Sequence, residues 1–503
     1  MSLFTRVRHS LGRAARVVST FVGSKYFFWA ILGVFVLQAV WIAWSGAYSM
    51  AYDEFFHLAA IQEYAKHWLP IATESAAHPE LGAFSRDPSF LYHYLMSFPY
   101  RVIVAFWHDS TMQIIVLRLI NISLFVGGMI LFWKTLLLAG FTKKVANILL
   151  FAFSLVPTFV LVAAQLNYDN MIFLVTAATL YLATDYLLRL HRKLPMHIPK
   201  FITLLGLLLS GSVVKYAFLP IAAAVGIVMV VETVFAFRRK ALSMSLVFAQ
   251  IKSARRWLMV VTSIFLVLSV GVFVQRIGMN VIKYHNPAPD CDQVISYEDC
   301  LQHDAYARND SYVNLKLSDK LSLRDKLTYP VSWYQQMLKE SFFVVGPKQT
   351  GYSTGAPLPT AYFAGYIIAT STVLLLVASA VWFVRENPVW RLWFLVIVTY
   401  TGVLFGLNYK EYLRLGVPVA IHGRYMVPVI ILMGALGVVT LQRFLKPRMR
   451  PYVYGVVGTL LVLLVLGGGW LPWVIRSADT WVWPHAVPAT RALRSILWNV
   501  IWK

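Results

Sequence analysis

Long apolar segments constrain this chain more than any other feature. "YFFWAILGVFVLQAVWIAW", from Tyr26, and "WLMVVTSIFLVLSVGVFV", from Trp257, are each long enough to cross a hydrocarbon core of roughly 30 Å as a helix. Of the 503 residues, 59% are hydrophobic and 13% are charged, which is too apolar for a soluble protein of this length. Ten-residue blocks that alternate with period two are absent, which argues against an outer-membrane barrel. The sequence predicts an all-α polytopic membrane protein.

About eleven membrane-spanning helices are expected from the apolar segments. They are predicted at residues 26–48, 112–134, 145–164, 171–188, 200–217, 218–237, 257–275, 360–384, 390–407, 426–445 and 453–472. The stretch 200–237 is short for two spans, so a hairpin of broken or re-entrant helices is an open alternative there.

The formal net charge of +23 follows from membrane topology rather than from nucleic-acid binding. Basic residues cluster in short loops between the spans, namely Lys143-Lys144, residues 189–193, residues 238–240 with Arg255-Arg256, Arg385 and residues 443–450. Cytoplasmic loops carry such an excess of Lys and Arg, and anionic lipid headgroups are natural partners for it. We therefore expect a multi-pass protein of the cell membrane with these loops and the N-terminus in the cytoplasm.

This topology divides the chain into five parts. They are a basic cytoplasmic N-terminus (1–25), a transmembrane module (26–275) with an outer loop (46–111), an extracytoplasmic loop (276–359), C-terminal transmembrane helices (360–472) and an extracytoplasmic tail (473–503). The second loop holds the two cysteines of the chain, Cys291 and Cys300. An oxidising compartment favours a disulfide between them, and two free thiols are the alternative.

The stretch "AYDEFFHLAAIQEYAKHW" places Asp53, Glu54 and His57 directly after the first span. If residues 53–67 are helical, Asp53 and His57 lie one turn apart, Tyr64 shares their face and Glu54 sits at its edge. A carboxylate and an imidazole at this spacing can orient a hydroxyl, share a proton or hold a divalent cation. The alternative is that these groups only solvate a helix end at the headgroups.

Further polar groups are expected at the same outer rim. Asn167 and Asp169 occupy a turn between two spans, and Lys215 lies deep in an apolar hairpin. A cation at membrane depth usually faces a partner or a cavity, although it can also snorkel to the interface. The cations predicted to converge on the rim are Arg118, Lys215, Arg414 and Arg424. Arg grips phosphate oxygens bidentately, so the arrangement suits a lipid-linked phosphate beside a general base.

Four motifs carry a resemblance to a known family. In chain order they are "YDEFFH", "NYDN", "KYAFLP" and "HGRYMVP". This ordered set resembles the GT-C superfamily of membrane glycosyltransferases, and within it a bacterial branch whose domain has no assigned function. Three positions depart from the pattern: Tyr52 replaces a proline, His422 replaces a glutamine, and Asp87 stands where many GT-C enzymes have a histidine.

The resemblance implies a GT-C-like bundle that transfers a hexose or pentose from a polyprenyl-phosphate donor, with inversion, to a glycan, glycolipid or protein acceptor outside the membrane. Asp53 would be the catalytic base, and Glu54 and His57 would orient it or, with it, hold Mg²⁺ or Mn²⁺; members with and without a metal exist. Lys215 and Arg424 would bind the donor phosphate, with Arg118 and Arg414 as second choices. The residues expected to position the acceptor or other substrate groups are Asp169, Asn167, Tyr64, Asp87 and His422.

Three other functions remain open from the sequence. A non-catalytic scaffold would tolerate the loss of Asp53, Lys215 and Arg424 together. A transporter or flippase of envelope lipids would also carry charges at membrane depth, but it usually shows repeated halves, which this chain lacks. A lipid-linked glycan polymerase or ligase would share the donor but normally lacks acids directly after the first span. The amphipathic stretch "SWYQQMLKESFFVV" of the second loop is expected to form a helix over the site.

Overall fold

The computed structural model describes residues 17–71, 78–239, 242–345, 354–355 and 357–501. Within these ranges the chain is almost wholly helical, and the only sheet is the antiparallel pair of β1 (Val344–Val345) and β2 (Thr354–Gly355). An all-helical protein is therefore confirmed. Most of the predicted cytoplasmic N-terminus, residues 1–16, lies outside the described residues.

Eight helices of the described residues are long and apolar enough to cross a membrane. They are α2 (Lys25–Ser45), α5 (Ser110–Leu138), α8 (Tyr168–His191), η3 (Tyr216–Phe218) with α10 (Leu219–Arg238), α12 (Arg256–Phe273) with η4 (Val274–Gly278) and α13 (Met279–Tyr284), α18 (Pro359–Ala378), α20 (Pro388–Leu415), and η8 (Pro447–Met449) with α22 (Arg450–Val465). Each coincides with a predicted span. The seventh predicted span was placed too short, because its helix continues past residue 275 to Tyr284.

The three remaining predicted spans are helical but shorter or bent. The segment 145–164 is not one straight helix: α6 (Lys143–Ser154) and α7 (Pro157–Ala163) meet at 78°, and counting them as one span raises the number to nine. Pro157 lacks an amide N–H and so starts a new helix rather than continuing the first. The hairpin 200–237 contains two separate helices, α10 and the shorter α9 (Ile198–Val214), and α21 (Ile430–Phe444) is also short. The count of eleven spans stays a prediction.

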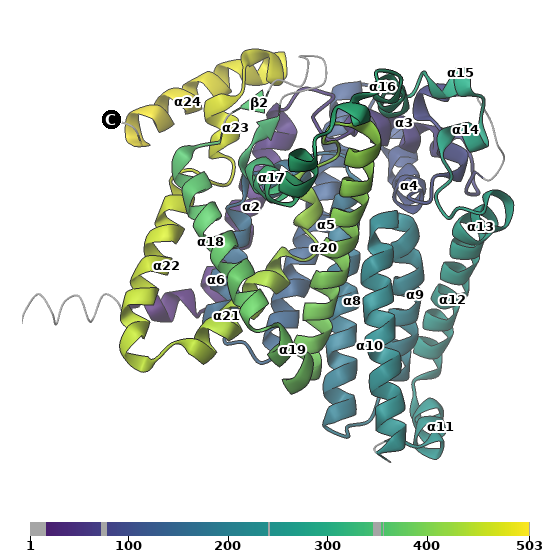
Figure 1. The fold of residues 1–503 in the computed structure, drawn as a ribbon, viewed down its shortest axis with the longest axis vertical. Helices are drawn as coiled ribbons and strands as arrows, with labels where there is room; N and C mark the ends of the chain where they lie inside the picture. The colour runs from purple at the N-terminus through teal and green to yellow at the C-terminus, as the bar shows by residue number, and fades with distance from the viewer. Residues whose placement is uncertain (1–16, 72–77, 240–241, 346–353, 356, 502–503) are drawn as a thin grey trace, which may run out of the picture.

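Most of the remaining elements gather at the upper end of the bundle in Figure 1, here called the site end. They are α3 (Glu54–Ala65), η1 (Pro79–Leu81), η2 (Phe84–Arg86), α4 (Leu91–Phe106), α14 (Cys291–Val294), α15 (Tyr297–Cys300), α16 (Asp304–Asn314), η5 (Leu317–Lys320), α17 (Leu323–Phe342), η7 (Gly423–Met426), α23 (Leu471–Arg476), η9 (Asp479–Trp481), η10 (Pro484–Ala486) and α24 (Val487–Ile501). The opposite end, here called the basic end, carries α11 (Met244–Ser253) and α19 (Ala380–Glu386).

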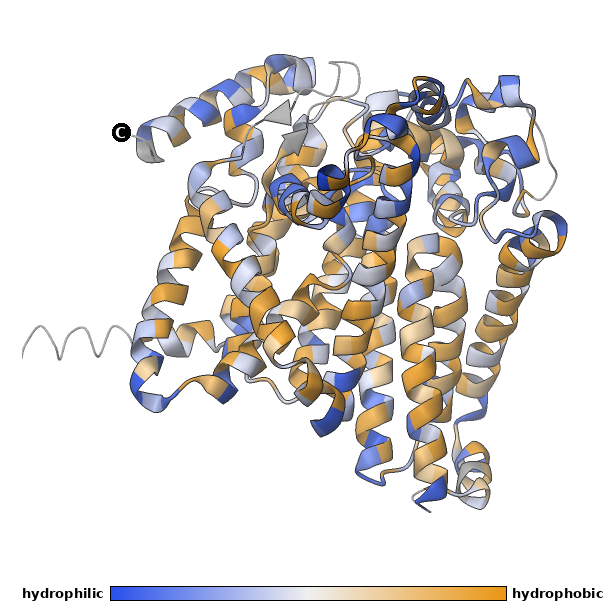
Figure 2. Ribbon diagram, viewed as in Figure 1, coloured by the Kyte–Doolittle hydropathy of each residue, from blue (hydrophilic) through white to orange (hydrophobic). Residues whose placement is uncertain are grey.

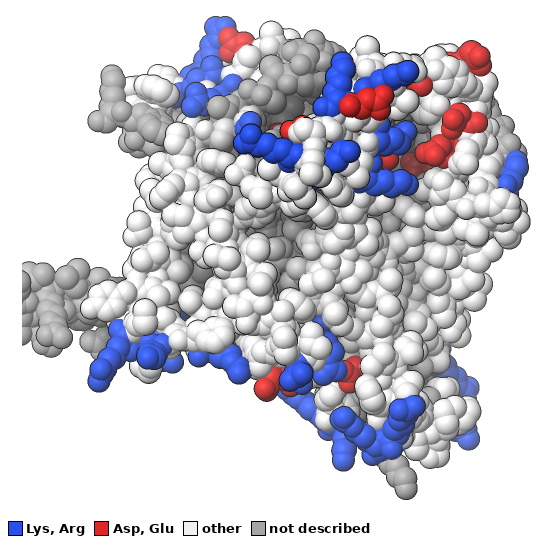
Figure 3. Space-filling model, in the orientation of Figure 1, with Lys and Arg blue, Asp and Glu red and all other residues white. Residues whose placement is uncertain are grey.

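Charge and hydropathy separate along the bundle axis. Apolar residues dominate the helices between the two ends in Figure 2, and the same belt is almost free of charge in Figure 3. Lys and Arg dominate the basic end, whereas both signs occur at the site end. An uncharged belt between two charged rims is the distribution expected of a multi-pass membrane protein.

The interior that supports the site is built on α5 and α8. Phe125 of α5 stacks on Phe173 of α8 with ring centroids 4.5 Å apart, and Phe153 of α6 stacks on the same ring at 5.4 Å. The two helices approach closely because Gly128 faces Phe173, where an added Cβ would lie 2.5 Å from the ring. This packing fixes the start of α8 beside α5, where Asn170 of α8 donates to Asn121 of α5 at 3.0 Å.

The extramembrane segments are tied to the bundle by specific contacts. Cys291 and Cys300 form the predicted disulfide, with an S–S distance of 2.12 Å. Arg276, buried in η4, donates to the carbonyl oxygens of Asp87 (2.9 Å) and Ile71 (2.8 Å) and lies over the Phe90 ring. This one guanidinium thus joins the first outer segment to the α12 span.

Candidate functional site

Asp53 sits at an abrupt change of backbone direction. Tyr52 and Asp53 both have left-handed φ values, 67° and 69°, and α3 starts at the next residue. Asp53 therefore caps the helix predicted over residues 53–67 instead of belonging to it, and its carbonyl oxygen accepts the His57 amide at 3.0 Å. An Asp tolerates this conformation better than most residues, whereas a Tyr rarely adopts it. The Asp53 side chain is 57% exposed, so a substrate can reach it.

Arg424 of η7 holds Asp53 from the inside. Its Nη2 donates to Asp53 Oδ2 at 3.1 Å and its Nη1 donates to the Tyr52 carbonyl oxygen, also at 3.1 Å. The guanidinium lies over the Tyr52 and Tyr425 rings, 4.9 and 5.1 Å from their centroids. Burial alone would lower the Arg424 pKa, but Tyr425, Asp53 and Asp169 raise it well above its usual value. Arg424 is therefore a permanent cation.

A second ion pair adjoins the first. Lys215, between α9 and η3, donates through Nζ to Asp169 Oδ1, and the other Asp169 oxygen is 3.9 Å from Arg424 Nε. The Lys215 and Asp169 side chains are 8% and 4% exposed. Asp53, Arg424, Asp169 and Lys215 thus alternate in sign, and we call these four residues the charged cluster. Its formal charges sum to zero, and its most exposed member is Asp53.

Asn167 fixes the cluster to the start of α8. As the residue that caps α8, it accepts the Asp169 amide through Oδ1 at 2.9 Å, and its Nδ2 donates to the Tyr52 carbonyl oxygen at 3.0 Å. The same carbonyl oxygen accepts from Arg424. Asn167 therefore holds the turn that presents Asp53, whereas the role predicted for it, contact with the acceptor or substrate, stays a prediction.

Helix α17 covers one side of the cluster, as expected of the amphipathic stretch. Ser341 of α17 lies against Gly423, where an added Cβ would be 2.0 Å from the Ser341 hydroxyl oxygen. Glu340, which the sequence reading did not single out, places Oε2 3.4 Å from His422 Nε2. Burial raises the Glu340 pKa. The only sequence feature that could have indicated Glu340 was its position as a lone acid in the amphipathic segment expected over the site.

His422 links α17 to the cluster through a defined tautomer. Its Nδ1 accepts the Arg424 backbone amide at 3.1 Å, so in the neutral ring the proton is on Nε2, which faces Glu340. Burial, and then the Arg424 charge, lower the His422 pKa well below its usual value, which keeps the ring neutral. The Tyr52 ring packs edge-on against it at 4.3 Å.

Glu54 and Arg118 form a closed pair beside the cluster. Arg118 donates to Glu54 Oε1 at 2.8 Å and to Oε2 at 2.7 Å, and both side chains are 0% exposed. The amides of Met50 and Leu166 donate to the same carboxylate, at 2.7 and 3.1 Å. Both oxygens of Glu54 are thus occupied, and Arg118 also binds two backbone carbonyl oxygens. The pair therefore has a structural role. We do not propose Glu54 as a base or metal ligand, or Arg118 as a phosphate ligand.

His57 faces a partner that we did not predict. Its Nδ1 is 2.8 Å from Nε2 of His93 on α4, and the two rings are stacked. Burial lowers the His93 pKa to about 3, and burial together with His93, Arg424 and Lys215 lowers the His57 pKa well below its usual value. Both imidazoles are therefore neutral at physiological pH. Tyr168 packs edge-on against His57 at 4.6 Å and lies under Lys215, so the pair adjoins the charged cluster.

Three other predicted site residues lie in different surroundings. Tyr64 is buried and its hydroxyl accepts from Arg276 at 3.3 Å. Asp87 accepts the Ser89 amide at 2.8 Å in the turn before α4. Arg414 pairs with Glu411 one turn away on α20, and its side chain is 51% exposed. In the part of the chain that the structure describes, no hydrogen bond or ion pair joins these three to the charged cluster.

The predicted metal ligands do not converge on one point. Asp53 turns toward Arg424, Glu54 toward Arg118 and His57 toward His93. Among the described residues no group of three or more His, Cys, Asp or Glu side chains is placed to hold a metal ion.

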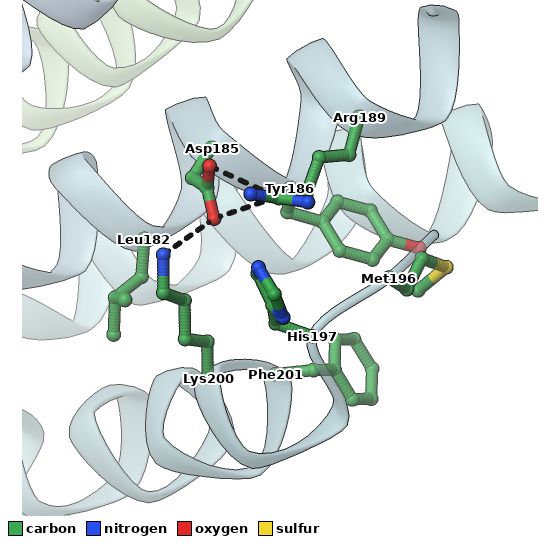
Figure 4. Close-up of a pocket in the computed structure, with 8 residues that line it drawn as sticks. All are labelled: Leu182, Asp185, Tyr186, Arg189, Met196, His197, Lys200 and Phe201. Atoms are coloured by element: carbon green, nitrogen blue, oxygen red, sulfur yellow. Dashed lines mark hydrogen bonds and ion pairs between the residues drawn. The ribbon is translucent and has the colours of Figure 1, made fainter. Parts of the chain in front are cut away.

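The charged cluster lies at the site end, and the pocket drawn in Figure 4 lies between α8 and α9 at the basic end.

Sequence comparison adds no further constraint on the site: no protein-family model and no curated protein matches this chain.

Proposed function

We propose that this protein is an inverting membrane glycosyltransferase that takes a sugar from a polyprenyl-phosphate donor at the outer face of the cytoplasmic membrane. The observation that carries the proposal is an exposed carboxylate, Asp53, held by a buried guanidinium beside a second, buried ion pair. The resemblance of four ordered motifs to GT-C enzymes supports it, because each motif contributes one of the four residues of the charged cluster. The basic loops and the disulfide favour the outward orientation.

Asp53 is the proton acceptor in this mechanism. A hydroxyl oxygen of the acceptor attacks the anomeric carbon, the bond from that carbon to the phosphate oxygen breaks, and the hydroxyl proton passes to Asp53 Oδ. Attack from the face opposite the phosphate inverts the anomeric centre. A positioned base contributes roughly 10²- to 10⁴-fold to such a step.

Arg424 and Lys215 stabilise the leaving phosphate. Arg424 uses three of its five N–H groups, on the Tyr52 carbonyl oxygen, Asp53 and the Tyr425 hydroxyl, and Lys215 uses one of its three ammonium N–H groups on Asp169, so each keeps donors for phosphate oxygens. Both are more than 90% buried, so their field is screened less than it would be in water. Fixed cations of this kind act where charge develops in the transition state.

Asn167, His422 and Glu340 are proposed to position the reacting groups. Asn167 maintains the turn that presents Asp53. His422 contacts Glu340 of α17 at the edge of the cluster. A carboxylate and an imidazole N–H at that edge are suited to sugar or acceptor hydroxyls. The prenyl chain lies in the membrane beside the apolar helices.

Lipid-linked glycan profiling of a deletion strain tests the proposal. We expect a precursor one sugar short to accumulate, the native gene to restore the full glycan, and Asp53→Asn not to restore it. Asp479→Asn is the matched control, because Asp479 also pairs with an arginine at the site end but lies in the tail. Accumulation of a complete lipid-linked glycan would contradict the proposal and favour a ligase, polymerase or flippase, and full rescue by Asp53→Asn would contradict it as well.

A further inference from the structure

The pocket at the basic end is lined by both charged and apolar side chains. Asp185 and Arg189 of α8 and Lys200 of α9 form its polar wall, His197 projects into it from the connection, and Leu182 and Phe201 supply apolar surface (Figure 4). Arg189 Nε donates to both Asp185 oxygens at 3.1 Å and Lys200 Nζ donates to Oδ2 at 3.0 Å. Asp185 thus holds two cations toward one space.

The donors of this pocket outnumber its acceptors. Besides Asp185, Arg189 binds only the Pro195 carbonyl oxygen, through Nη1, among the contacts of the described residues. That leaves Nη2 of Arg189 and two N–H groups of Lys200 for a ligand. Both Asp185 oxygens are occupied, so the remaining demand is for an anionic acceptor. The formal charges of these three residues sum to +1, which a singly charged anion would neutralise.

The pKa of the His197 imidazole responds to the positive charges of Arg189 and Lys200. Burial lowers its pKa, and Arg189 and Lys200 lower it further, while Asp185 opposes them with a smaller effect. The field at the ring is therefore positive even with Asp185 in place. An anion in the pocket would relieve it.

The pocket lies at the depth of lipid headgroups. Asp169 of the charged cluster and Arg189 are both on α8, and 20 residues of helix rise about 30 Å, which is the thickness of a bilayer hydrocarbon core. With the charged cluster at one membrane surface, the pocket therefore lies at the other. The space between two membrane helices on a basic rim is a recurrent place for anionic headgroups.

The cavity itself measures about 10 Å³, which is room for about one water, and the Lys200 side chain at its mouth is 41% exposed. We propose that the mouth of this pocket binds the phosphate of a singly charged phosphodiester, supplied by an anionic lipid headgroup of the adjoining leaflet. Arg189 Nη2 and the Lys200 ammonium contact the phosphate oxygens, His197 borders the headgroup, and the acyl chains run along the outer surfaces of α8 and α9 within the membrane. The ligand lies about one bilayer core away from the charged cluster, so this proposal does not depend on the proposed transferase activity.

Binding of short-chain phosphatidylglycerol to delipidated protein in neutral detergent tests the proposal. We expect Arg189→Gln/Lys200→Gln to weaken binding about tenfold or more, since two charge-assisted contacts are lost. Arg192→Gln/Lys193→Gln is the matched control, because it removes the same charge from exposed residues of the same connection, and we expect a change of less than about twofold. Equal weakening by both pairs, or no binding to the native protein, would overturn the proposal.

Asp185→Asn gives a test of opposite sign that keeps the donors. It removes the competing carboxylate, so we expect phosphatidylglycerol to bind about threefold tighter. Weaker or unchanged binding by a folded Asp185→Asn protein, checked by thermal unfolding, would contradict the proposal. Inorganic phosphate distinguishes the source: failure to compete supports a lipid headgroup, and competition supports the same site with a water-soluble phosphate ligand.

Discussion

Two adjacent carboxylates, Asp53 and Glu54, have opposite surroundings. Asp53 is 57% exposed and has one guanidinium partner, whereas Glu54 is 0% exposed and accepts two hydrogen bonds from Arg118 and two from backbone amides. The left-handed turn at Asp53 separates them, because it directs one side chain outward before α3 begins and the other inward.

The comparison shows what distinguishes a carboxylate that can react from one that holds the fold. Glu54 has no free acceptor site, so it cannot take a proton or a metal without losing a bond that the fold needs. Asp53 keeps an exposed oxygen beside a permanent cation. The acidic pair after the first span is therefore best interpreted as one structural and one functional residue.

Breaking the closed pair should produce the largest loss of stability. Glu54→Gln leaves the Arg118 charge buried without its partner, and we expect a loss of about 3–5 kcal/mol in the free energy of unfolding. Thermal unfolding in detergent measures it. Glu63→Gln is the control, since Glu63 lies on the same helix in a partly exposed pair and should cost less than about 1 kcal/mol. Equal effects of the two changes would refute the structural role of Glu54.

Acid should destabilise the protein through the His57–His93 pair. Both pKa values are lowered, that of His93 to about 3, so below pH 6.5 the unfolded chain binds more protons than the folded one and stability falls with pH. At pH 5.5 the loss is about 1.4 kcal/mol for each imidazole relative to pH 8, or about 3 kcal/mol together. Above pH 7 the pair should have no effect.

Thermal unfolding of the native protein and of His57→Gln/His93→Gln, compared between pH 8 and pH 5.5, measures this contribution. The double variant should lose less stability on acidification than the native protein does. An identical pH dependence of the two proteins would show that the imidazoles are not held neutral.

Changing the Asp53–Arg424 ion pair should alter the affinity for the donor more than the stability of the protein. Arg424→Lys keeps the charge but loses the fork that reaches both Asp53 and the Tyr52 carbonyl oxygen. We expect the KM for the polyprenyl-phosphate donor to rise about tenfold. Arg414→Lys, in an exposed pair on α20, should change it by less than about twofold, and a larger effect of Arg414→Lys would place the phosphate elsewhere.

The sequence was most informative where apolar patterning decides the structure. Every predicted span coincides with a helix or a bent helix pair, because an apolar window of that length has few other solutions in a membrane. The helix after Asp53 and the disulfide were predictable from local features. The 78° bend before Pro157 was signalled by that proline, yet a hydropathy window does not register it.

Contacts between distant segments were beyond the sequence. Arg118 pairs with a carboxylate 64 positions earlier, and nothing in a single sequence identifies which acid it meets. His93 and Glu340 each lie in helical segments without a motif, and only packing brings them to His57 and His422. The left-handed conformation of Tyr52 and Asp53, which delays the start of the predicted helix to Glu54, was also beyond the sequence, because contacts of the Tyr52 carbonyl oxygen with Asn167 and Arg424 stabilise it.

The most direct test of the account is the rate of sugar transfer by purified Asp53→Asn protein, with thermal unfolding measured on the same sample. We predict a fall of about 100-fold or more in rate, since the proton acceptor is lost, with a loss of stability of about 1 kcal/mol, smaller than that of Glu54→Gln because Asp53 is 57% exposed and Arg424 keeps Asp169 nearby. A near-native rate from the folded variant would contradict the central claim that Asp53 is the base.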